Sequence, residues 1–492
     1  MNRFLRTTVI AAAATAVFAQ SVPLLEQIRA HLTANDLRAD VSFLASDALE
    51  GRGTPSLGLD IAAEFVAAQF RRAGLEPVGD DGYFQTAPFA TISPDSEGLS
   101  LVYDAGGVVT KADPSKIVIQ NGAGLDLNRA PVLKVVATDT AAMNALTPDQ
   151  VKGKVVILQS ENQGRGGRGG RGFMPVSPAL RDAALVVTLR PTVPAMNQAP
   201  QLRDMAAAST PPSIILSDAA IASAIATAKA GPLDAAISVH MAAPSVTPVK
   251  LRNVVGLLRG SDPALKDTYI ILTGHYDHLG IRGTGPGDHI FNGANDDASG
   301  TSSVIEIANA LAALHTRPRR SIVFMALFGE ERGDLGSRYY ASHPIFPLAK
   351  TIADVNLEQL GRTDETGEGE KLGQFNLTGF DFTDMPAVFH KCGELTGIKA
   401  VKDEAKSDSY FSRSDNAAFA AVGVPSTTLS VTYSYSDYHG AGDEWPKLDY
   451  ENMAKVDWTI ALAVYQMADG TGAPQWNANN PKTEAYRKAR AN

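Results

Sequence analysis

The sequence predicts an α/β protein, in which a mixed, mostly parallel central sheet is flanked by helices and carries a small β-rich inserted domain. Apolar runs at 269–273 and 321–328 enclose a segment whose apolar residues recur at helical spacing. These residues are Val304, Ile307, Ala308, Leu311 and Leu314. Strand–helix–strand alternation is typical of a parallel sheet buried between helices. Residues 119–247 instead contain short β-branched runs separated by Pro, Gly and Asp, which predicts the inserted domain.

The length of the chain also indicates two domains, because 492 residues are too many for one compact core. Residues 20–118 and 248–476 are expected to form one domain around the insert. The last residues, 477–492, are polar, and we expect them to form a loose tail.

Residues 1–19 are expected to be a secretory signal peptide. Two arginines precede an apolar stretch at 7–18, and Val17-Phe18-Ala19 suits cleavage before the next residue. The apolar stretch is shorter than the roughly 20 residues that a membrane span requires. The single cysteine, Cys392, lies far from the N-terminus, so no lipoprotein anchor and no intramolecular disulfide are expected. We therefore expect a free periplasmic or secreted protein.

The charge argues against nucleic acid and membrane as partners. The formal net charge is −9, and loss of the two signal-peptide arginines lowers it by two, to about −11. Residues 164–172 repeat Arg-Gly-Gly, a composition that some RNA-binding proteins use. In an acidic exported protein we interpret this repeat as a flexible exposed loop.

Polar residues follow the predicted strands at the points where the strands end. In open α/β sheets, ligands bind just beyond the carboxyl ends of the strands, so such residues are the first candidates for a functional site. The clusters are Gly274-His275-Tyr276-Asp277-His278, Gly293 to Gly300, Gly329-Glu330-Glu331, Asn356-Leu357-Glu358 and Tyr438-His439. Any one of these clusters alone is weak evidence for a functional site. Five such clusters, each at the end of a predicted strand, predict one shared site.

The residue types in these clusters indicate a hydrolytic metal site. Imidazole and carboxylate are the ligands of catalytic zinc, and one carboxylate shared between two ions holds them roughly 3.5 to 4 Å apart. No thiol belongs to the clusters. The sequence therefore favours a metal site built from histidine and acidic residues.

The order of the motifs resembles the M28 family of di-zinc peptidases. The matching motifs are H-Y-D, G-A-N-D-D-A-S-G, E-E, N-x-E and Y-H, with supporting matches at 49–53, 335–337, 414–415 and 423–425. The resemblance covers nearly the whole mature chain and implies a zinc-exopeptidase fold. The insert resembles the protease-associated domain that many members carry, from its pattern and position. On this resemblance, residues 248–476 are the catalytic peptidase domain.

The resemblance implies a role for each motif residue. Asp296 would bridge two zinc ions, with His275 and Glu358 completing one site and Glu331 and His439 the other, although the pairing stays open. Glu330 would be the general base, taking a proton from the attacking water. Asp277 would orient His275. Tyr438 would donate a hydrogen bond to the developing oxyanion, and a core tyrosine is the alternative interpretation.

Two positions depart from the family pattern, and other histidines remain outside it. Many members have Asp where this chain has Glu358, and many have His where it has Asn416. We interpret the remaining histidines as structural or surface residues. These are His31, His240, His278, His289, His315, His343 and His390.

The resemblance implies an aminopeptidase that acts on peptides with a free N-terminus. A carboxypeptidase or dipeptidase on the same scaffold is the first alternative, and it would need an arginine to bind the substrate carboxylate. Arg332, Arg362 and Arg413 are candidates for that role, but none is placed opposite the metals by sequence. A single-zinc glutaminyl cyclase and a non-catalytic, receptor-like binding module are further alternatives. The preferred side chain, the role of the insert and the oligomeric state are not predicted.

Overall fold

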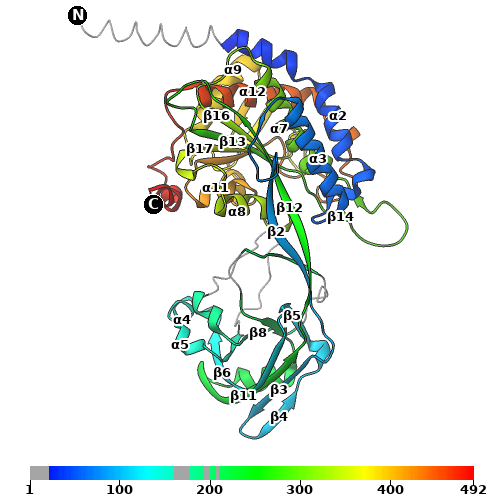
Figure 1. The fold of residues 1–492 in the computed structure, drawn as a ribbon, viewed down its shortest axis with the longest axis vertical. Helices are drawn as coiled ribbons and strands as arrows, with labels where there is room; N and C mark the ends of the chain where they lie inside the picture. The colour runs from blue at the N-terminus through cyan, green and yellow to red at the C-terminus, as the bar shows by residue number, and fades with distance from the viewer. Residues whose placement is uncertain (1–20, 160–176, 193–199, 207–209, 492) are drawn as a thin grey trace, which may run out of the picture. The chain divides into compact units, whose positions relative to one another are not determined.

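A computed structural model describes residues 21–159, 177–192, 200–206 and 210–491 (Figure 1). The predicted signal peptide and the Arg-Gly-Gly repeat lie outside the described residues. Contacts divide the chain into a first unit, Met1–Ala87 with Leu251–Asn492, and an inserted unit, Pro88–Lys250. No described helix is both long enough and apolar enough to cross a membrane.

The first unit contains the predicted mixed sheet, which is parallel at its centre and antiparallel next to it. Within this unit the strand order is β21-β20-β22-β17-β13-β16-β12-β2, and Figure 1 labels β17, β13, β16, β12 and β2. The central strands are parallel to one another: β13 (Tyr269–His275), β16 (Ser321–Leu327), β17 (Thr351–Leu357) and β22 (Ser426–Ser430). The flanking strands are β2 (Phe84–Ser93), β12 (Ser245–Leu258), β20 (Gln374–Leu377) and β21 (Lys399–Val401). Because β12 and β20 run antiparallel to their central neighbours, the sheet is mixed as expected.

Helices cover both faces of this sheet (Figure 1). On one face, Ile271 and Val323 pack in a core with Tyr340 and Phe419 from α8 and α11. Side chains alternate across a strand, so the neighbouring residues of β13 and β16 face the other layer, where α7 contacts both strands. The helices of the first face are α8 (Leu335–Ser342) and α11 (Asn416–Ala421). Those of the other layer are α2 (Ala34–Leu44), α3 (Leu57–Arg72), α7 (Gly300–Ala313), α9 (Met385–Thr396) and α12 (Tyr450–Asp469).

The predicted helix between β13 and β16 is α7, which begins directly after the polar motif 293–300. Val304, Ile307, Ala308 and Leu311 are completely buried. A helix that is apolar on nearly all sides belongs in the interior of a protein, and here it packs against three parallel strands. The helix therefore fixes the position of the polar residues at its N-terminal end.

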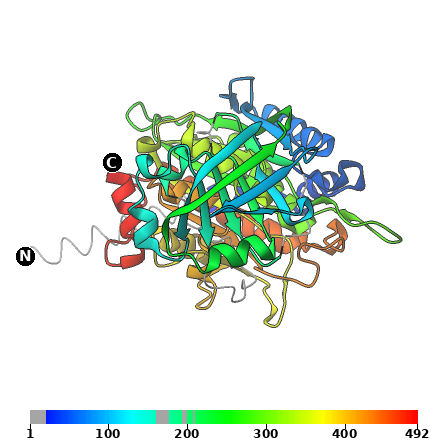
Figure 2. The same ribbon diagram turned by 90° about the horizontal axis from the view of Figure 1, so that it is seen from below.

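The inserted unit has its own sheet and begins earlier than we predicted from the sequence (Figures 1 and 2). The strand order is β4-β3-β11-β6-β7-β8-β10-β5. The strands are β3 (Ser100–Ala105), β4 (Val108–Lys111), β5 (Ile117–Asn121), β6 (Leu125–Val136), β7 (Val155–Gln159), β8 (Leu185–Leu189), β10 (Ser213–Leu216) and β11 (Gly231–Met241). The boundary moves from 119 to Pro88, because β3 and β5 pair with β11 and β10 of this sheet.

The expected loose tail is a packed helix, which corrects the sequence interpretation. α13 spans Glu484–Ala491. The ring of Tyr486 stacks on Trp476 with centroids 4.9 Å apart, and it also contacts Phe411. The guanidinium of Arg490 donates a hydrogen bond to the carbonyl of Leu348 at 2.8 Å. An aromatic side chain and an arginine in an otherwise polar segment thus attach this helix to the first unit.

Candidate metal centre

The polar clusters meet at the carboxyl edge of the parallel strands, as the strand-exit pattern predicts. His275 is the last residue of β13, and Glu358 directly follows β17. Glu330 and Glu331 begin the short helix η5 (Glu330–Arg332) that follows β16. Asp296 lies in the turn η4 (Ala294–Ser299) before α7. Parallel strands present their carboxyl ends at one edge, so residues far apart in sequence converge there.

Asp296 lies between two histidines. Its Oδ1 is 3.3 Å from Nε2 of His275, and its Oδ2 is 3.1 Å from Nε2 of His439. Only 3% of Asp296 is exposed, so neither oxygen is freely hydrated. Each carboxylate oxygen therefore faces a different imidazole, which is the arrangement that a bridging ligand requires.

The other two predicted ligands extend this arrangement in opposite directions. Oε1 of Glu358 lies 3.9 Å from Nε2 of His275. Oε1 of Glu331 lies 3.1 Å from Nε2 of His439. The structure thus groups His275 with Glu358 and His439 with Glu331 on the two sides of Asp296. Their roles as metal ligands remain predictions.

Asp277 supports both His275 and the loop that carries Glu330. The backbone carbonyl of Asp277 lies 3.1 Å from Nδ1 of His275, closer than the carboxylate Oδ1 at 3.5 Å. The carboxylate accepts hydrogen bonds from the backbone N–H of Glu330 and from the hydroxyl of Thr54, both at 3.0 Å. Asp277 therefore lies where the sequence predicted an orienting group, and its backbone makes the shorter contact with the histidine.

Buried carboxylates dominate the electrostatics of the site. Burial raises the pKa of Glu358 to about 7, and the negative charge of Asp296 adds to this effect. Burial also raises the pKa of Glu330 well above its ordinary range, with Glu358 and Glu331 as further causes. Burial is the main cause of these shifts, and the neighbouring carboxylates add a negative charge that a divalent cation would balance. The imidazole and carboxylate donors also suit zinc, so the residues present fit such an ion.

Asp296 and Glu331 show the opposite shift. Burial alone would raise the pKa of Asp296, but hydrogen bonds with His275 and His439 hold it far below its ordinary value. Burial and Asp296 raise the pKa of Glu331, while His278 and His439 lower it, with a net pKa of about 2. These two carboxylates are therefore ionised over the physiological range and available as ligands.

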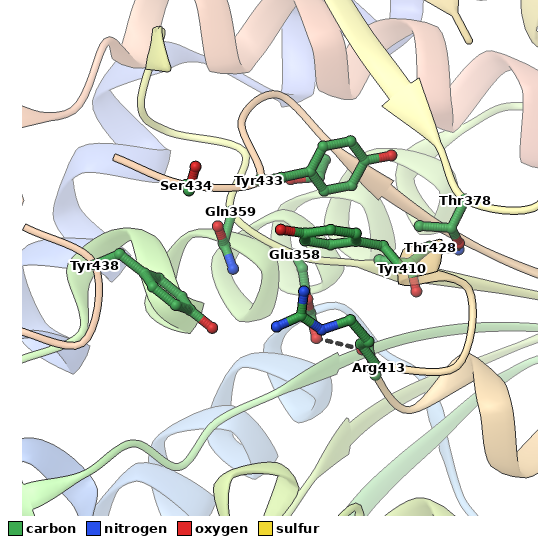
Figure 3. A pocket seen from close by; sticks show the side chains of 11 residues that line it. Glu358, Gln359, Thr378, Tyr410, Arg413, Thr428, Tyr433, Ser434 and Tyr438 are labelled. Atoms are coloured by element: carbon green, nitrogen blue, oxygen red, sulfur yellow. Dashed lines mark hydrogen bonds between the residues drawn. The ribbon is translucent and has the colours of Figure 1, made fainter. Parts of the chain in front are cut away.

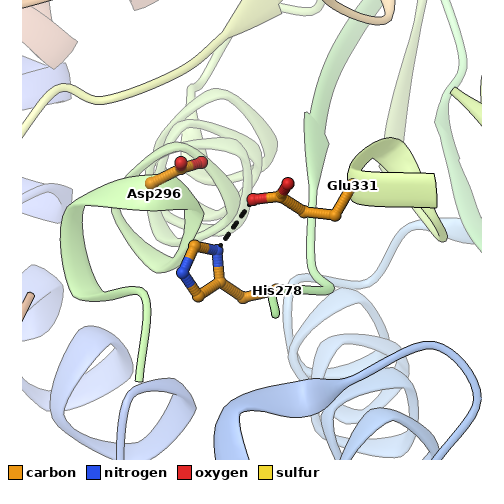
Figure 4. A group of neighbouring side chains, drawn as sticks. All are labelled: His278, Asp296 and Glu331. Carbon is orange, nitrogen blue, oxygen red and sulfur yellow. Dashed lines mark ion pairs between the residues drawn. The ribbon is translucent and has the colours of Figure 1, made fainter. Parts of the chain in front are cut away.

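His278 lies beside the proposed ligands, whereas the sequence alone placed it among the structural and surface histidines. Its Nδ1 lies 3.0 Å from Oε1 of Glu331, and the residue is 2% exposed. His278, Asp296 and Glu331 each offer a ligand atom, and these atoms lie within 4.8 Å of one another (Figure 4). The sequence feature that could have identified His278 is its position three residues after His275, at the end of the same strand.

The loops of the site are held by a buried arginine and a buried aspartate. Arg52, which is fully buried, donates hydrogen bonds to the carbonyls of Tyr276 at 2.8 Å and Asn292 at 2.7 Å. Asp443 accepts hydrogen bonds from the backbone N–H groups of Asn295 and Asp296, each at 3.1 Å. Arg52 lies in the 49–53 motif. This motif therefore stabilises the loops beneath the site through the hydrogen bonds of Arg52.

Two further polar residues lie behind the proposed ligands. The hydroxyl of Ser414 donates a hydrogen bond to Oε1 of Glu358. Asn416 donates to the carbonyl of Phe411 at 2.9 Å and accepts from the hydroxyl of Thr428 at 2.8 Å. Asn416 therefore belongs to the surroundings of the site, as expected for the position that departs from the family pattern.

The sequence profile of Peptidase family M28 matches residues 253–464, which contain all the strand-exit clusters. This segment belongs to peptidase family M28. The mixed sheet and flanking helices agree with this assignment.

Curated relatives match part of the chain. A "probable zinc metalloprotease" of Leptosphaeria maculans is 29% identical over 203 residues, 41% of this chain and 44% of that protein. A "probable leucine aminopeptidase 2" of Aspergillus oryzae is 26% identical over 265 residues, 48% of each chain. The chain thus spans about half the length of these relatives.

A solved structure shares the fold. The aminopeptidase from Aneurinibacillus sp. strain AM-1 matches with a TM-score of 0.54 and 19% identity. The match covers 91% of this chain and 97% of that chain. At 19% identity, this structural similarity supports the assigned fold only.

A cavity of about 120 Å³ opens in the M28 segment beside Glu358 (Figure 3). Tyr438 lies at its wall, and the ring stacks on His439 with centroids 4.0 Å apart. Because 37% of Tyr438 is exposed, it is not a core tyrosine. Burial, followed by the carboxylates of Asp296 and Glu331, raises its pKa above the ordinary value, so the hydroxyl keeps its proton and remains a hydrogen-bond donor.

Proposed function

We propose that this protein is an exported metallo-aminopeptidase that holds two zinc ions and removes the N-terminal residue of peptides. The observation that carries the proposal is the position of Asp296, whose two oxygens face His275 and His439 at 3.3 and 3.1 Å. A buried carboxylate with an imidazole on each side is poorly explained as scaffold, because two acidic groups, Glu331 and Glu358, adjoin the same imidazoles.

The proposed ligands form two sets that share Asp296. His275 and Glu358 form one set, and His439 and Glu331 form the other. When bound, zinc ions polarise the scissile carbonyl and promote the ionisation of water. Asp277 holds His275 in place from behind, since its carbonyl lies 3.1 Å from Nδ1 of that ring.

Glu330 is proposed as the group that moves the proton. Its carboxylate accepts a proton from the attacking water and passes it to the leaving amine. Burial and the neighbouring Glu358 raise the pKa of Glu330, which favours a group that can hold this proton during the reaction. The hydroxyl of Tyr438 donates a hydrogen bond to the carbonyl oxygen as negative charge develops on it.

A free α-amino group suits this site better than a blocked one. The carboxylates of Glu330 and Glu358 offer negative potential and hydrogen-bond acceptors to an ammonium group near the metals. The Aspergillus oryzae relative is named a leucine aminopeptidase, and the structure with the shared fold is an aminopeptidase, which supports the same choice. One observation favours a carboxypeptidase or dipeptidase instead, since Arg413 lines the cavity beside Glu358.

We also propose a cellular location for the protein and a domain type for the inserted unit. The N-terminal residues 1–19 resemble a secretory signal, so the enzyme would work in the periplasm or outside the cell. The β-rich inserted unit, with its own hydrophobic core, is consistent with a protease-associated domain.

The deciding experiment compares one peptide in free, N-acetylated and C-amidated forms with purified, zinc-loaded protein. We expect acetylation to abolish hydrolysis and amidation to leave the rate nearly unchanged. The reverse result would identify a carboxypeptidase. Zinc content, measured by mass spectrometry, should be two ions per chain. One ion would favour a glutaminyl cyclase, and none a non-catalytic binding module.

A further inference from the structure

We propose that the cavity beside Glu358 binds a carboxylate of the substrate, and that Arg413 is the side chain that recognises it. This inference rests on the proposed peptidase function and names the class of substrate that the same site prefers. The carboxylate comes from one of two sources: an acidic side chain on the N-terminal residue, or the C-terminus of a dipeptide.

The cavity adjoins the proposed reaction centre. Glu358 and Tyr438 both line it, and both also belong to the metal centre (Figure 3). Its volume of about 120 Å³ is enough for one small polar side chain or a terminal carboxylate. A group held in this cavity is therefore close to the bond that would be cleaved.

The wall of the cavity is polar. No aliphatic Leu, Ile, Val or Met is among the lining residues, which also include Thr378, Tyr410, Ser414, Thr428, Ser430 and Ser434. One further lining group, the hydroxyl of Tyr433, is buried and has no hydrogen-bond partner among the described residues. This hydroxyl can donate to a carboxylate, whereas an apolar side chain would leave it unpaired, and such a site rejects apolar substrates strongly.

Arg413 supplies the positive charge of the cavity. Its guanidinium lies 4.1 Å from the centroid of the Tyr410 ring, so stacking restricts its orientation. Figure 3 shows the group turned toward the hydroxyl of Tyr438. No ion pair within the described part of the chain engages Arg413. Its N–H groups are therefore available for a bidentate contact with a carboxylate.

The other two arginines considered as carboxylate-binding residues do not compete for this role. Arg362 is held by Asp364 at 2.7 Å and by Asp437 at 3.0 Å. Arg332 does not line the cavity. Because Glu358 also lines the cavity, an anion entering it needs compensation, and Arg413 is the single cationic side chain among the lining residues.

The test uses full-length, zinc-loaded protein and the variants Arg413→Met and Arg413→Lys. The first arm compares the anilides of Glu, Gln and Leu. The second compares a dipeptide that has a neutral N-terminal residue with its C-terminal amide. Arg338→Met is the matched control, because Arg338 is an exposed arginine of α8 that pairs with Asp334. Zinc content and melting temperature are measured for every variant to exclude a folding defect.

We expect Arg413→Met to lower kcat/KM for the carboxylate substrate by about 10- to 100-fold, with Lys retaining part of the rate. The neutral substrates should change by less than about 3-fold. A loss confined to the Glu anilide identifies the side chain as the source, and a loss confined to the unblocked dipeptide identifies the C-terminus. An equal change for charged and neutral substrates overturns the inference, although hydrolysis of neutral anilides would still support the aminopeptidase.

A binding measurement keeps the inference testable without turnover. Isothermal titration with free glutamate and glutamine reports recognition of a side-chain carboxylate, because both ligands carry the same α-carboxylate and only glutamate has a second one. With the side chain as the source, the wild-type protein should bind glutamate more tightly, and Arg413→Met should lose that difference; with the C-terminus as the source, Arg413→Met should weaken the binding of both. If glutamate and glutamine bind the wild type equally and neither arm shows a preference, the cavity does not recognise carboxylates.

Discussion

Oδ1 of Asp277 accepts a hydrogen bond from the backbone N–H of Glu330 at 3.0 Å. The same aspartate lies against His275 through its backbone carbonyl. One buried residue thus positions both a proposed ligand and the proposed base. Because the bond is made by the backbone of Glu330, the side chain of Glu330 can be changed without breaking it.

Glu330→Gln should therefore fold normally, keep its zinc and lose turnover. Glutamine has nearly the same shape but cannot take the proton from water, and general-base catalysis is worth about 10²- to 10⁴-fold. We expect kcat to fall by about that factor, measured with a small aminoacyl anilide. Zinc content is measured on the same sample. Loss of zinc together with activity would show that Glu330 is a ligand and not the base.

Asp296→Ala should remove at least one zinc ion, because Asp296 is, among the residues that the structure describes, the one that pairs with both His275 and His439. Metal content after dialysis against a weak chelator measures this loss. Asp288→Asn is the matched control, since Asp288 is an exposed acidic residue whose carboxylate accepts a hydrogen bond from the backbone N–H of Ile290. A variant of Asp296 that still holds two ions would contradict the bridging role.

His278→Ala should weaken zinc binding by about 10- to 100-fold, because its ring contacts Oε1 of Glu331 at 3.0 Å. Competition with a chromophoric chelator gives the affinity. His289→Ala is the matched control, since the His289 ring bonds to the carbonyls of Arg282 and Gly285. Equal affinities for His278→Ala and wild type would support the original interpretation of His278 as a scaffold histidine.

The parallel strands and the strand-exit clusters could be predicted because both are local patterns. An apolar run followed by a polar residue at 275 or 358 is visible within one segment, and parallel strands bring such segments to one edge. The start of the inserted unit could not be predicted in this way. β3 pairs with β11, more than a hundred residues later, and no local pattern at 100–118 indicates that partner.

Residue type alone also failed to separate neighbouring candidates within the site. His275 and His278 are both histidines after the same strand, and only the position of Glu331 reveals that the second faces the centre. Arg413 and Arg362 are equally close to motifs in sequence. The structure distinguishes them, because carboxylates already engage Arg362 while Arg413 lines the cavity. Such distinctions depend on tertiary partners.

The last prediction concerns Asp40, a buried carboxyl group on α2 that faces Glu306 of α7. Burial raises the pKa of Asp40 to about 8, and the charge of Glu306 contributes further. Arg72 forms an ion pair with Glu306 at 3.2 Å and partly offsets the repulsion. An unfolded aspartate loses its proton near pH 4. Between about pH 4 and pH 8 the folded chain therefore binds more protons than the unfolded chain, and its stability falls as the pH rises.

Asparagine at position 40 cannot ionise, so the stability of Asp40→Asn should not fall in this way as the pH rises. Relative to wild type, the variant should gain on the order of 4 kcal/mol in free energy of unfolding between pH 5 and pH 9, because about three pH units, each worth about 1.4 kcal/mol, separate pH 5 from the pKa of Asp40 in the folded chain. Melting temperatures measured across that range report the change, and the gain must appear at the alkaline end. Asp60→Asn on α3 is the matched control, since it removes an exposed carboxylate and leaves the Asp40–Glu306 pair intact. If the difference between Asp40→Asn and wild type stays constant from pH 5 to pH 9, Asp40 does not carry its proton in the folded state.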